Sequence, residues 1–180
     1  MRRGQATTPP VLKLRQPPAK ASSSSSTGSA GARRAAPGVA DQAARDLVAR
    51  AIGADGYAKH LGLELVVARR GSTTVGMRVG TQHVNFNNRC HGGAIFSLAD
   101  MALGLACNSY GTIAALIDGN ISISKAVELG EWLVAQATEV SRSRKVAVYR
   151  VDVSRASDRA HVACLSGTVY LLDKPVTVKT

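Results

Sequence analysis

Residues 92–107 constrain the fold of this 180-residue chain more than any other segment. They predict one helix with apolar residues on every side, and such a helix is normally buried in a core. One carboxylate, Asp100, stands near its centre, and an unpaired buried carboxylate is costly. The helix opens with His91-Gly92-Gly93, whose backbone N–H groups bring its positive end to the surroundings. The combination points to chemistry on a carbonyl group, with a purely structural Asp100 as the alternative.

Strand-like segments lie on both sides of this helix in the sequence. Six runs have the composition and alternation of strands: 63–69, 73–79, 113–123, 132–140, 145–153 and 160–172. The last run is apolar on both faces, as a central strand would be. We also expect a helix at 41–52 with Asp41 as its cap, and a helical turn at 57–61. Six strands around one central helix predict an α+β domain.

The first 40 residues differ in composition from the rest of the chain. They contain no acidic or aromatic residue, five of the six prolines and seven of the 23 basic residues. We predict a disordered basic tail at 1–40, because such a segment buries too little apolar surface to offset its ordering entropy. The remainder holds 16 basic and 12 acidic residues and is only mildly basic. A non-functional extension, a polyanion-binding arm and a targeting segment all remain open for the tail.

The remaining composition narrows the expected partners. Three cysteines occur without the paired spacing of a metal site, and the longest apolar stretch is interrupted by Ser97 and Asp100. Aromatic residues suited to stacking on bases do not accompany the basic tail. We therefore expect a cytoplasmic protein with no metal, no membrane association and no nucleic acid partner.

The string HVNFNNRCHGGAIFSLADMALGLACNSYG, residues 83–111, carries a family resemblance. It resembles the signature of the hotdog-fold thioesterases, in the PaaI-like group of phenylacetate degradation, and the likeness extends from about Ala44 to Leu172. The resemblance implies a hotdog domain at 41–175, an antiparallel sheet wrapped around the 92–107 helix. It also implies hydrolysis of an acyl-coenzyme A thioester, including phenylacetyl-type ones. No cofactor is implied beyond the coenzyme A (CoA) of the substrate.

The resemblance also implies roles for individual residues. Gly92 matches the glycine whose backbone N–H polarises the thioester carbonyl, and Asp100 matches the base or nucleophile. Asn85 and His91 match positions that line the same pocket. We add Gly93 to this substrate-binding set, although loop shaping by Asn85 and His91 and close packing at Gly93 stay open as structural readings. Relatives often have an aromatic residue near Ile123, so the acyl pocket is expected to differ here.

Physical chemistry supports these roles without the resemblance. A preorganised N–H donor commonly stabilises a developing oxyanion by a few kcal/mol, roughly 10²–10³ in rate, and a shielded Asp100 can act as a base near neutrality or attack directly. Arg142 and Arg144 are candidates for binding the CoA phosphates, with a solvated charged run as the alternative. Among the aromatic residues, Tyr57 and Phe96 are expected to lie in the core and not in the substrate pocket.

Spacing along the helix predicts an oligomer. Gly92 and Asp100 lie eight residues apart, which is about 12 Å at 1.5 Å per residue. One carbonyl cannot contact both, so if both groups act at one carbonyl they must come from two chains. We therefore expect a homodimer with composite sites, or a homotetramer built from two such dimers. A non-catalytic acyl-CoA binding module and a hotdog dehydratase or hydratase that uses His91 remain the alternative functions.

Overall fold

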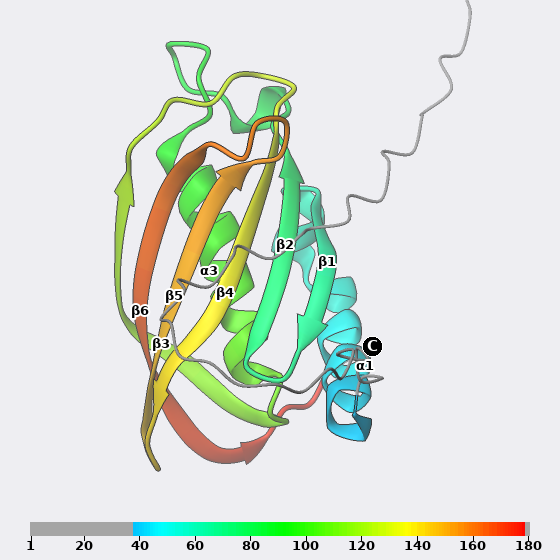
Figure 1. Ribbon diagram of the computed structural model, residues 1–180. Coiled ribbons are helices and arrows are strands. Elements are labelled where there is room, and N and C mark those ends of the chain that lie inside the picture. Colours follow the sequence, from blue (N-terminus) through cyan, green and yellow to red (C-terminus); the bar gives the residue numbers. More distant parts are fainter. Residues whose placement is uncertain (1–37, 179–180) are drawn as a thin grey trace, which may run out of the picture. The chain divides into compact units, whose positions relative to one another are not determined.

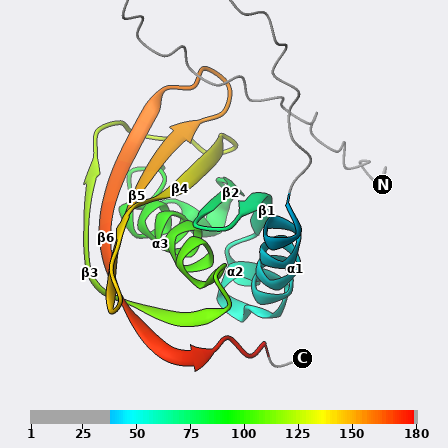
Figure 2. The same cartoon turned by 60° about the horizontal axis from the view of Figure 1, so that its bottom comes forward.

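A computed structural model describes residues 38–178, so the predicted tail at 1–40 falls outside the described residues except for its last three positions. The described part is a six-stranded antiparallel sheet curved around one long helix, α3 (Gly92–Asn108) (Figures 1 and 2). This is the α+β architecture predicted from the sequence, and it is the hotdog arrangement.

All six predicted strands are present, four of them longer by one or two residues than predicted. They are β1 (Leu63–Arg69), β2 (Ser72–Arg78), β3 (Thr112–Ile123), β4 (Trp132–Arg142), β5 (Val146–Arg155) and β6 (His161–Pro175). Their order in the sheet is β1-β2-β4-β5-β6-β3, with every neighbouring pair antiparallel. β6 therefore lies inside the sheet, which agrees with its apolar content on both faces. β1 and β3 are the edge strands.

The core lies between the concave face of the sheet and α3. Alternate residues of β5 face inward: Tyr149, Val151 and Val153 are all fully buried, while Arg150 between them is exposed. α3 packs against β2, β3, β4 and β5 (Figure 2). Burial of apolar surface on this scale is the main stabilising contribution in a domain of this size.

Two N-terminal helices, α1 (Val39–Ala54) and α2 (Gly56–His60), flank the side of α3 away from most of the sheet (Figure 2). The prediction that Asp41 caps the first helix is wrong. The helix begins two residues earlier, after Gly38, which offers no side-chain cap. Asp41 instead accepts a hydrogen bond from the backbone N–H of Arg70, at 3.2 Å, and so joins α1 to the β1–β2 turn.

Burial of α3 is one-sided, which differs from the fully buried helix expected. Nine of its 17 residues are buried, but a stripe at helical spacing remains partly or fully exposed: Gly92, Gly93, Phe96, Ser97, Asp100, Met101, Gly104 and Asn108. The sheet covers one side of the helix and leaves this stripe accessible in a single chain. Asp100 is therefore only partly buried.

Helix length and hydropathy also bear on membrane contact. Across residues 38–178, no helix combines the length and the apolar character needed to cross a bilayer.

Candidate active site

The first turn of α3 is held by backbone and side-chain hydrogen bonds on all sides of Gly92. The N–H groups of Cys90 and His91 donate to the carbonyls of Val127 (2.8 Å) and His83 (2.7 Å). His91 is the N-cap, and its Nδ1 accepts from the N–H of Gly93 at 2.9 Å. No acceptor within residues 38–178 pairs with the N–H of Gly92. One donor is thus left open at the positive end of the helix.

The surroundings of Gly92 favour close approach by a ligand. The residue is partly exposed, and a Cβ added to it would lie 3.2 Å from Cδ1 of Ile123 on β3. Glycine therefore keeps a narrow space between the helix start and β3 free of side-chain atoms. The geometry suits an N–H that must reach a carbonyl oxygen.

Asp100 lies on the accessible stripe of α3, two turns beyond Gly92. Partial burial raises the pKa of its carboxyl above the ordinary value. None of the described residues forms an ion pair or hydrogen bond with this carboxylate in the single chain. A shielded, unpartnered carboxylate of this kind is a candidate base or nucleophile rather than a structural ion pair.

Asn85 shapes the loop that leads into α3. Its Oδ1 accepts from the N–H groups of Asn87 (2.9 Å) and Arg89 (3.2 Å), and its own N–H donates to the carbonyl of Arg89 at 2.7 Å. Asn88 has a positive φ of 55°, which asparagine tolerates well. These bonds support the loop-forming reading of Asn85, and its substrate-binding role stays a prediction.

Arg142 and Arg144 lie near the opposite end of α3 from Gly92. The guanidinium of Arg142 stacks on the ring of Tyr110, 3.8 Å from the ring centroid, and its Nη1 lies 3.5 Å from Oε2 of Glu139. Arg144 is exposed in the β4–β5 turn. Because α3 has 17 residues and rises about 1.5 Å per residue, these arginines do not share a site with Gly92 of the same chain.

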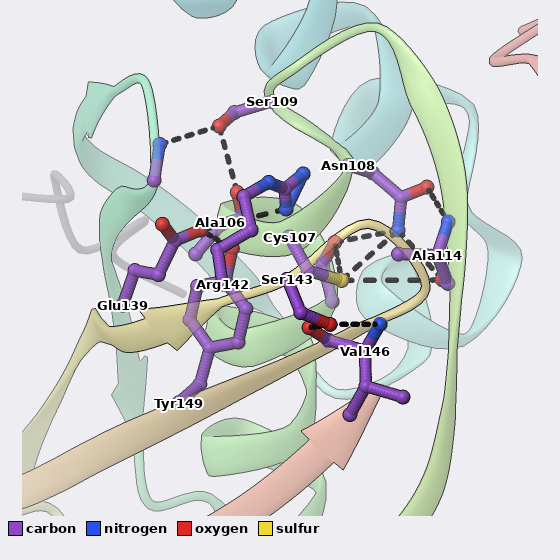
Figure 3. Close-up of polar contacts among 12 residues, drawn as sticks. Ala106, Cys107, Asn108, Ser109, Ala114, Glu139, Arg142, Ser143, Val146 and Tyr149 are labelled. Carbon is purple, nitrogen blue, oxygen red and sulfur yellow. Dashed lines mark hydrogen bonds and ion pairs between the residues drawn. The ribbon is translucent and has the colours of Figure 1, made fainter. Parts of the chain in front are cut away.

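The C-terminal end of α3 is bonded throughout (Figure 3). The side chain of Asn108 donates to the carbonyls of Gly104 (2.8 Å) and Ala114 (3.1 Å) and accepts from the N–H of Ala114 at 3.0 Å. Ser109 Oγ accepts from the N–H of Gly71 at 2.8 Å and donates to the carbonyl of Ala106 at 2.7 Å. These contacts fix α3 to the start of β3 and to the β1–β2 turn.

A cavity of about 500 Å³ adjoins the start of α3, and its lining includes residues that the sequence analysis did not assign to a site. Tyr57 and Phe96, expected in the core, both line it. The expectation is wrong for Tyr57, which is 56% exposed because α2 packs at the rim of the domain. Phe96 is half-buried and also packs against the core. His83, the first residue of the 83–111 motif, to which the sequence analysis assigned no role, lines it as well. Only the fold brings these residues together.

Histidine, cysteine, aspartate and glutamate are the side chains that most often bind metal ions in proteins. Within the described part of the chain, no group of three or more of them is arranged to hold a metal ion.

Comparison with known proteins agrees with this architecture. The thioesterase superfamily model matches residues 87–161, the segment that holds the start of α3 and Asp100. A proposed esterase of Archaeoglobus fulgidus is 40% identical over 114 residues, 63% of this chain and 73% of that protein. The acyl-coenzyme A thioesterase PaaI of Escherichia coli is 31% identical over 123 residues, 68% of this chain and 87% of that protein.

Solved structures show the same likeness. The PaaI protein from the phenylacetic acid degradation operon of E. coli superposes with a TM-score of 0.74 at 28% identity, covering 76% of this chain and 99% of that one. The smu.793 protein of Streptococcus mutans, solved bound to acetyl CoA, gives 0.61 at 27% identity, covering 63% and 91%. The fold and the site define a hotdog-fold thioester hydrolase. The chain belongs to the thioesterase superfamily, and its relatives place it with the PaaI-like members.

Proposed function

We propose that this protein hydrolyses an acyl-CoA thioester to the free acid and CoA. The observation that carries the proposal is that α3 presents two polar groups without a bonding partner: the backbone N–H of Gly92 and the carboxylate of Asp100. Gly92 would hold the carbonyl oxygen and stabilise the charge that develops on it. The PaaI thioesterase of E. coli and the acetyl-CoA complex of the S. mutans protein support this substrate class.

In the proposed reaction, Asp100 takes a proton from water as the water oxygen attacks the carbonyl carbon. The tetrahedral oxyanion, bonded to Gly92 N–H, collapses and breaks the carbon–sulfur bond, and the proton on Asp100 passes to the departing thiolate. Alternatively, Asp100 attacks directly, expels the thiolate and forms an anhydride that water then cleaves. Single-turnover hydrolysis in ¹⁸O-labelled water tests for the anhydride. Attack of water on the Asp100 carbonyl carbon of the anhydride would leave ¹⁸O on Asp100 and unlabelled oxygen in the product, which the general-base route cannot do.

If both groups act on one carbonyl, the distance between them calls for two chains. Gly92 and Asp100 are about 12 Å apart along one helix, so one carbonyl can meet both only if α3 of a partner runs antiparallel beside it. A twofold axis near Phe96 would place Gly92 of each chain opposite Asp100 of the other. The accessible stripe of α3, which includes Gly104 with open space where a Cβ would lie, allows such an approach.

β3 supports the same dimer. It is a 12-residue edge strand with one unpaired side, and it exposes the large apolar side chains Ile117 (61%) and Ile123 (43%). Long apolar edges of this kind are normally paired or covered. Pairing of two β3 strands would join the sheets and bring the two α3 helices together on the concave side. Further assembly to a tetramer and a cytoplasmic location stay predictions.

Intersubunit complementation tests the composite site. Asp100→Asn and Gly92→Pro chains are each expected to be inactive alone, since the first lacks the carboxylate and the second lacks the N–H. After denaturation and mixed refolding, half of the dimers are hybrids with one intact site of two, so activity should recover to about a quarter of wild type. No recovery, with hybrids demonstrated by mass spectrometry, would show that each site lies within one chain.

Two experiments separate this function from its alternatives. Thiol release from a panel of acyl-CoA thioesters establishes hydrolysis, whereas binding without turnover would indicate a non-catalytic module. Hydratase activity would appear as water addition to an enoyl-CoA. His91 does not favour that chemistry, because its Nδ1 serves as the cap of α3, and no acidic side chain within residues 38–178 bonds to it.

The CoA phosphates need a cationic surface within reach of the reacting sulfur. Arg144 is exposed and forms no ion pair with a described residue, whereas Arg142 is engaged by Tyr110 and Glu139. Arg144→Ala should therefore raise KM for acyl-CoA more than Arg142→Ala, with kcat little changed. If a thioester of pantetheine alone shows the same rise in KM, the phosphate role is wrong.

A further inference from the structure

The loop that leads into α3 is attached to a second loop, between β3 and β4, at the same end of the sheet (Figure 1). The backbone of Arg89 forms an isolated β-bridge with Glu128, and their side chains form an ion pair. The next residue, Cys90, donates its backbone N–H to the carbonyl of Val127 at 2.8 Å, and Val127 is fully buried. The direction of the Gly92 N–H, two residues further on, therefore depends on where residues 127 and 128 lie.

The carboxylate of Glu131 holds Glu128 in place. Its Oε2 accepts the backbone N–H of Glu128 at 2.8 Å. The backbone of the turn itself is bonded to the end of β2, since the N–H of Gly130 donates to the carbonyl of Val79 at 2.8 Å and the N–H of Val79 donates to the carbonyl of Glu131 at 2.9 Å. Residues 130 and 131 are thus anchored by their backbone, and Glu128 is joined to that anchor by the Glu131 side chain.

Arg155, the last residue of β5, fixes the orientation of the Glu131 carboxylate. Its Nη1 donates to Oε1 of Glu131 at 2.8 Å, and both side chains are 23% exposed. Its Nε and Nη2 donate to Oδ1 and Oδ2 of Asp158 at 3.0 and 2.9 Å, so the guanidinium is held from two sides with little freedom to turn. One oxygen of Glu131 is therefore bonded to the sheet through Arg155, and the other is bonded to the loop through Glu128.

We propose that Glu131 is a positioning residue for the reaction: together with Arg155 it holds the β3–β4 loop against the loop before α3, and thereby aims the Gly92 N–H at the thioester carbonyl. The proposal rests on the thioesterase function above. Neither side chain lines the cavity beside the start of α3, so the effect on rate passes through the backbone. A donor for a developing oxyanion tolerates little displacement, since a misplacement of about 1 Å can cost about 10²-fold in rate.

Removal of the Glu131 carboxylate tests its role in catalysis. Glu131→Ala should lower kcat about 10- to 100-fold with KM for acyl-CoA little changed, because the N–H is needed most in the transition state. Glu131→Gln still offers an oxygen to the N–H of Glu128 and should recover most of that loss. Asp158→Asn, the matched control, alters the other partner of Arg155 and should keep kcat within about twofold of wild type. An unchanged kcat in folded Glu131→Ala overturns the proposal.

Combination with Gly92→Pro separates positioning from a general loosening of the domain. Gly92→Pro has already lost the N–H, so Glu131→Ala should add almost nothing to its loss of kcat, whereas independent effects would multiply. Full multiplication would show that Glu131 acts elsewhere and would overturn the proposal. If Glu131→Ala does not fold, Arg155→Met takes its place, because it removes the ion pair and leaves the bond between Glu131 and Glu128. Its smaller loss of kcat should also vanish in the Gly92→Pro background.

Hydrogen–deuterium exchange tests the structural part of the proposal without turnover. The N–H of Cys90 is bonded to the β3–β4 loop, so peptides that contain it should exchange faster in Glu131→Ala than in wild type, while peptides from the C-terminal end of α3 should not change. Faster exchange in a protein that hydrolyses no thioester would refute the function and leave the control of this loop by Glu131 standing. Thioester hydrolysis with neither exchange nor kcat altered in Glu131→Ala would leave the function standing and refute the role of Glu131.

Discussion

The two ends of α3 differ in how completely their polar groups are bonded. At the C-terminal end, Asn108 and Ser109 together form five hydrogen bonds to the backbone of Gly71, Gly104, Ala106 and Ala114 (Figure 3). At the N-terminal end, His91 caps Gly93 while the N–H of Gly92 stays open. Buried polar groups are normally paired, so the saturated end indicates anchoring and the open end indicates ligand binding.

Asp100, in the middle of α3, resembles the N-terminal end because its carboxylate also lacks a bonding partner. Glu139, near the C-terminal end, accepts a 2.6 Å hydrogen bond from the hydroxyl of Tyr149 and lies beside Arg142. Asp100 has no such partner within the described chain, and burial alone raises its pKa. One carboxylate is held by its surroundings and the other is left available for reaction.

The largest expected effect comes from the available carboxylate. Asp100→Asn should lower kcat by about 10²–10⁴, the usual contribution of a positioned base, with no loss of stability. Thiol release and urea unfolding on the same samples measure both quantities. An Asp100→Asn enzyme with a kcat near that of wild type would place Asp100 among structural residues.

The next largest loss of kcat is expected when the backbone N–H of Gly92 is removed. Gly92→Pro deletes it at the first helical position, where proline is well tolerated, and the extended backbone of His91 (ψ 136°) suits a following proline. We expect kcat to fall about 10²–10³-fold. Gly92→Ala keeps the N–H and only crowds Ile123, so it should lose far less; equal losses in both variants would implicate shape rather than the N–H.

The saturated end should respond in stability instead of rate. Ser109→Ala leaves the buried N–H of Gly71 unpaired, which should lower the free energy of unfolding by about 1–3 kcal/mol and leave kcat of the folded enzyme unchanged. Ser157→Ala, in the exposed β5–β6 turn, is the matched control. A kcat loss in Ser109→Ala without destabilisation would break the distinction between the two ends.

The smallest expected effect is the contribution of the Asp100 carboxyl to the pH dependence of the free energy of unfolding. Its pKa is raised in the folded chain, so folding favours the protonated form, and this contribution is lost as pH rises through the folded pKa. Asp100→Asn should therefore gain stability over wild type at neutral pH and lose that gain at pH 3. Urea midpoints across pH 3–8 measure it, and a constant difference would mean that the folded pKa is not raised.

Local patterns in the sequence were sufficient for much of the fold. The apolar helix at 92–107 and the six strands were predicted because burial imposes a period on neighbouring residues, and that period is visible without tertiary information. The cap of the first helix was not predictable in the same way. Asp41 has the right side chain for a cap, but its contact with Arg70 depends on a turn 29 residues away.

The sequence by itself determined the spacing of Gly92 and Asp100 on one helix, and with it the prediction of a composite site from two chains, because helical rise is a local property. It also determined the family, through residues 83–111. Only the tertiary structure decided that Asp100 is partly accessible, and that Tyr57 and His83 meet at one cavity. Those outcomes depend on which faces of α2, α3 and the sheet pack together, and such long-range packing leaves no periodic signal along the chain.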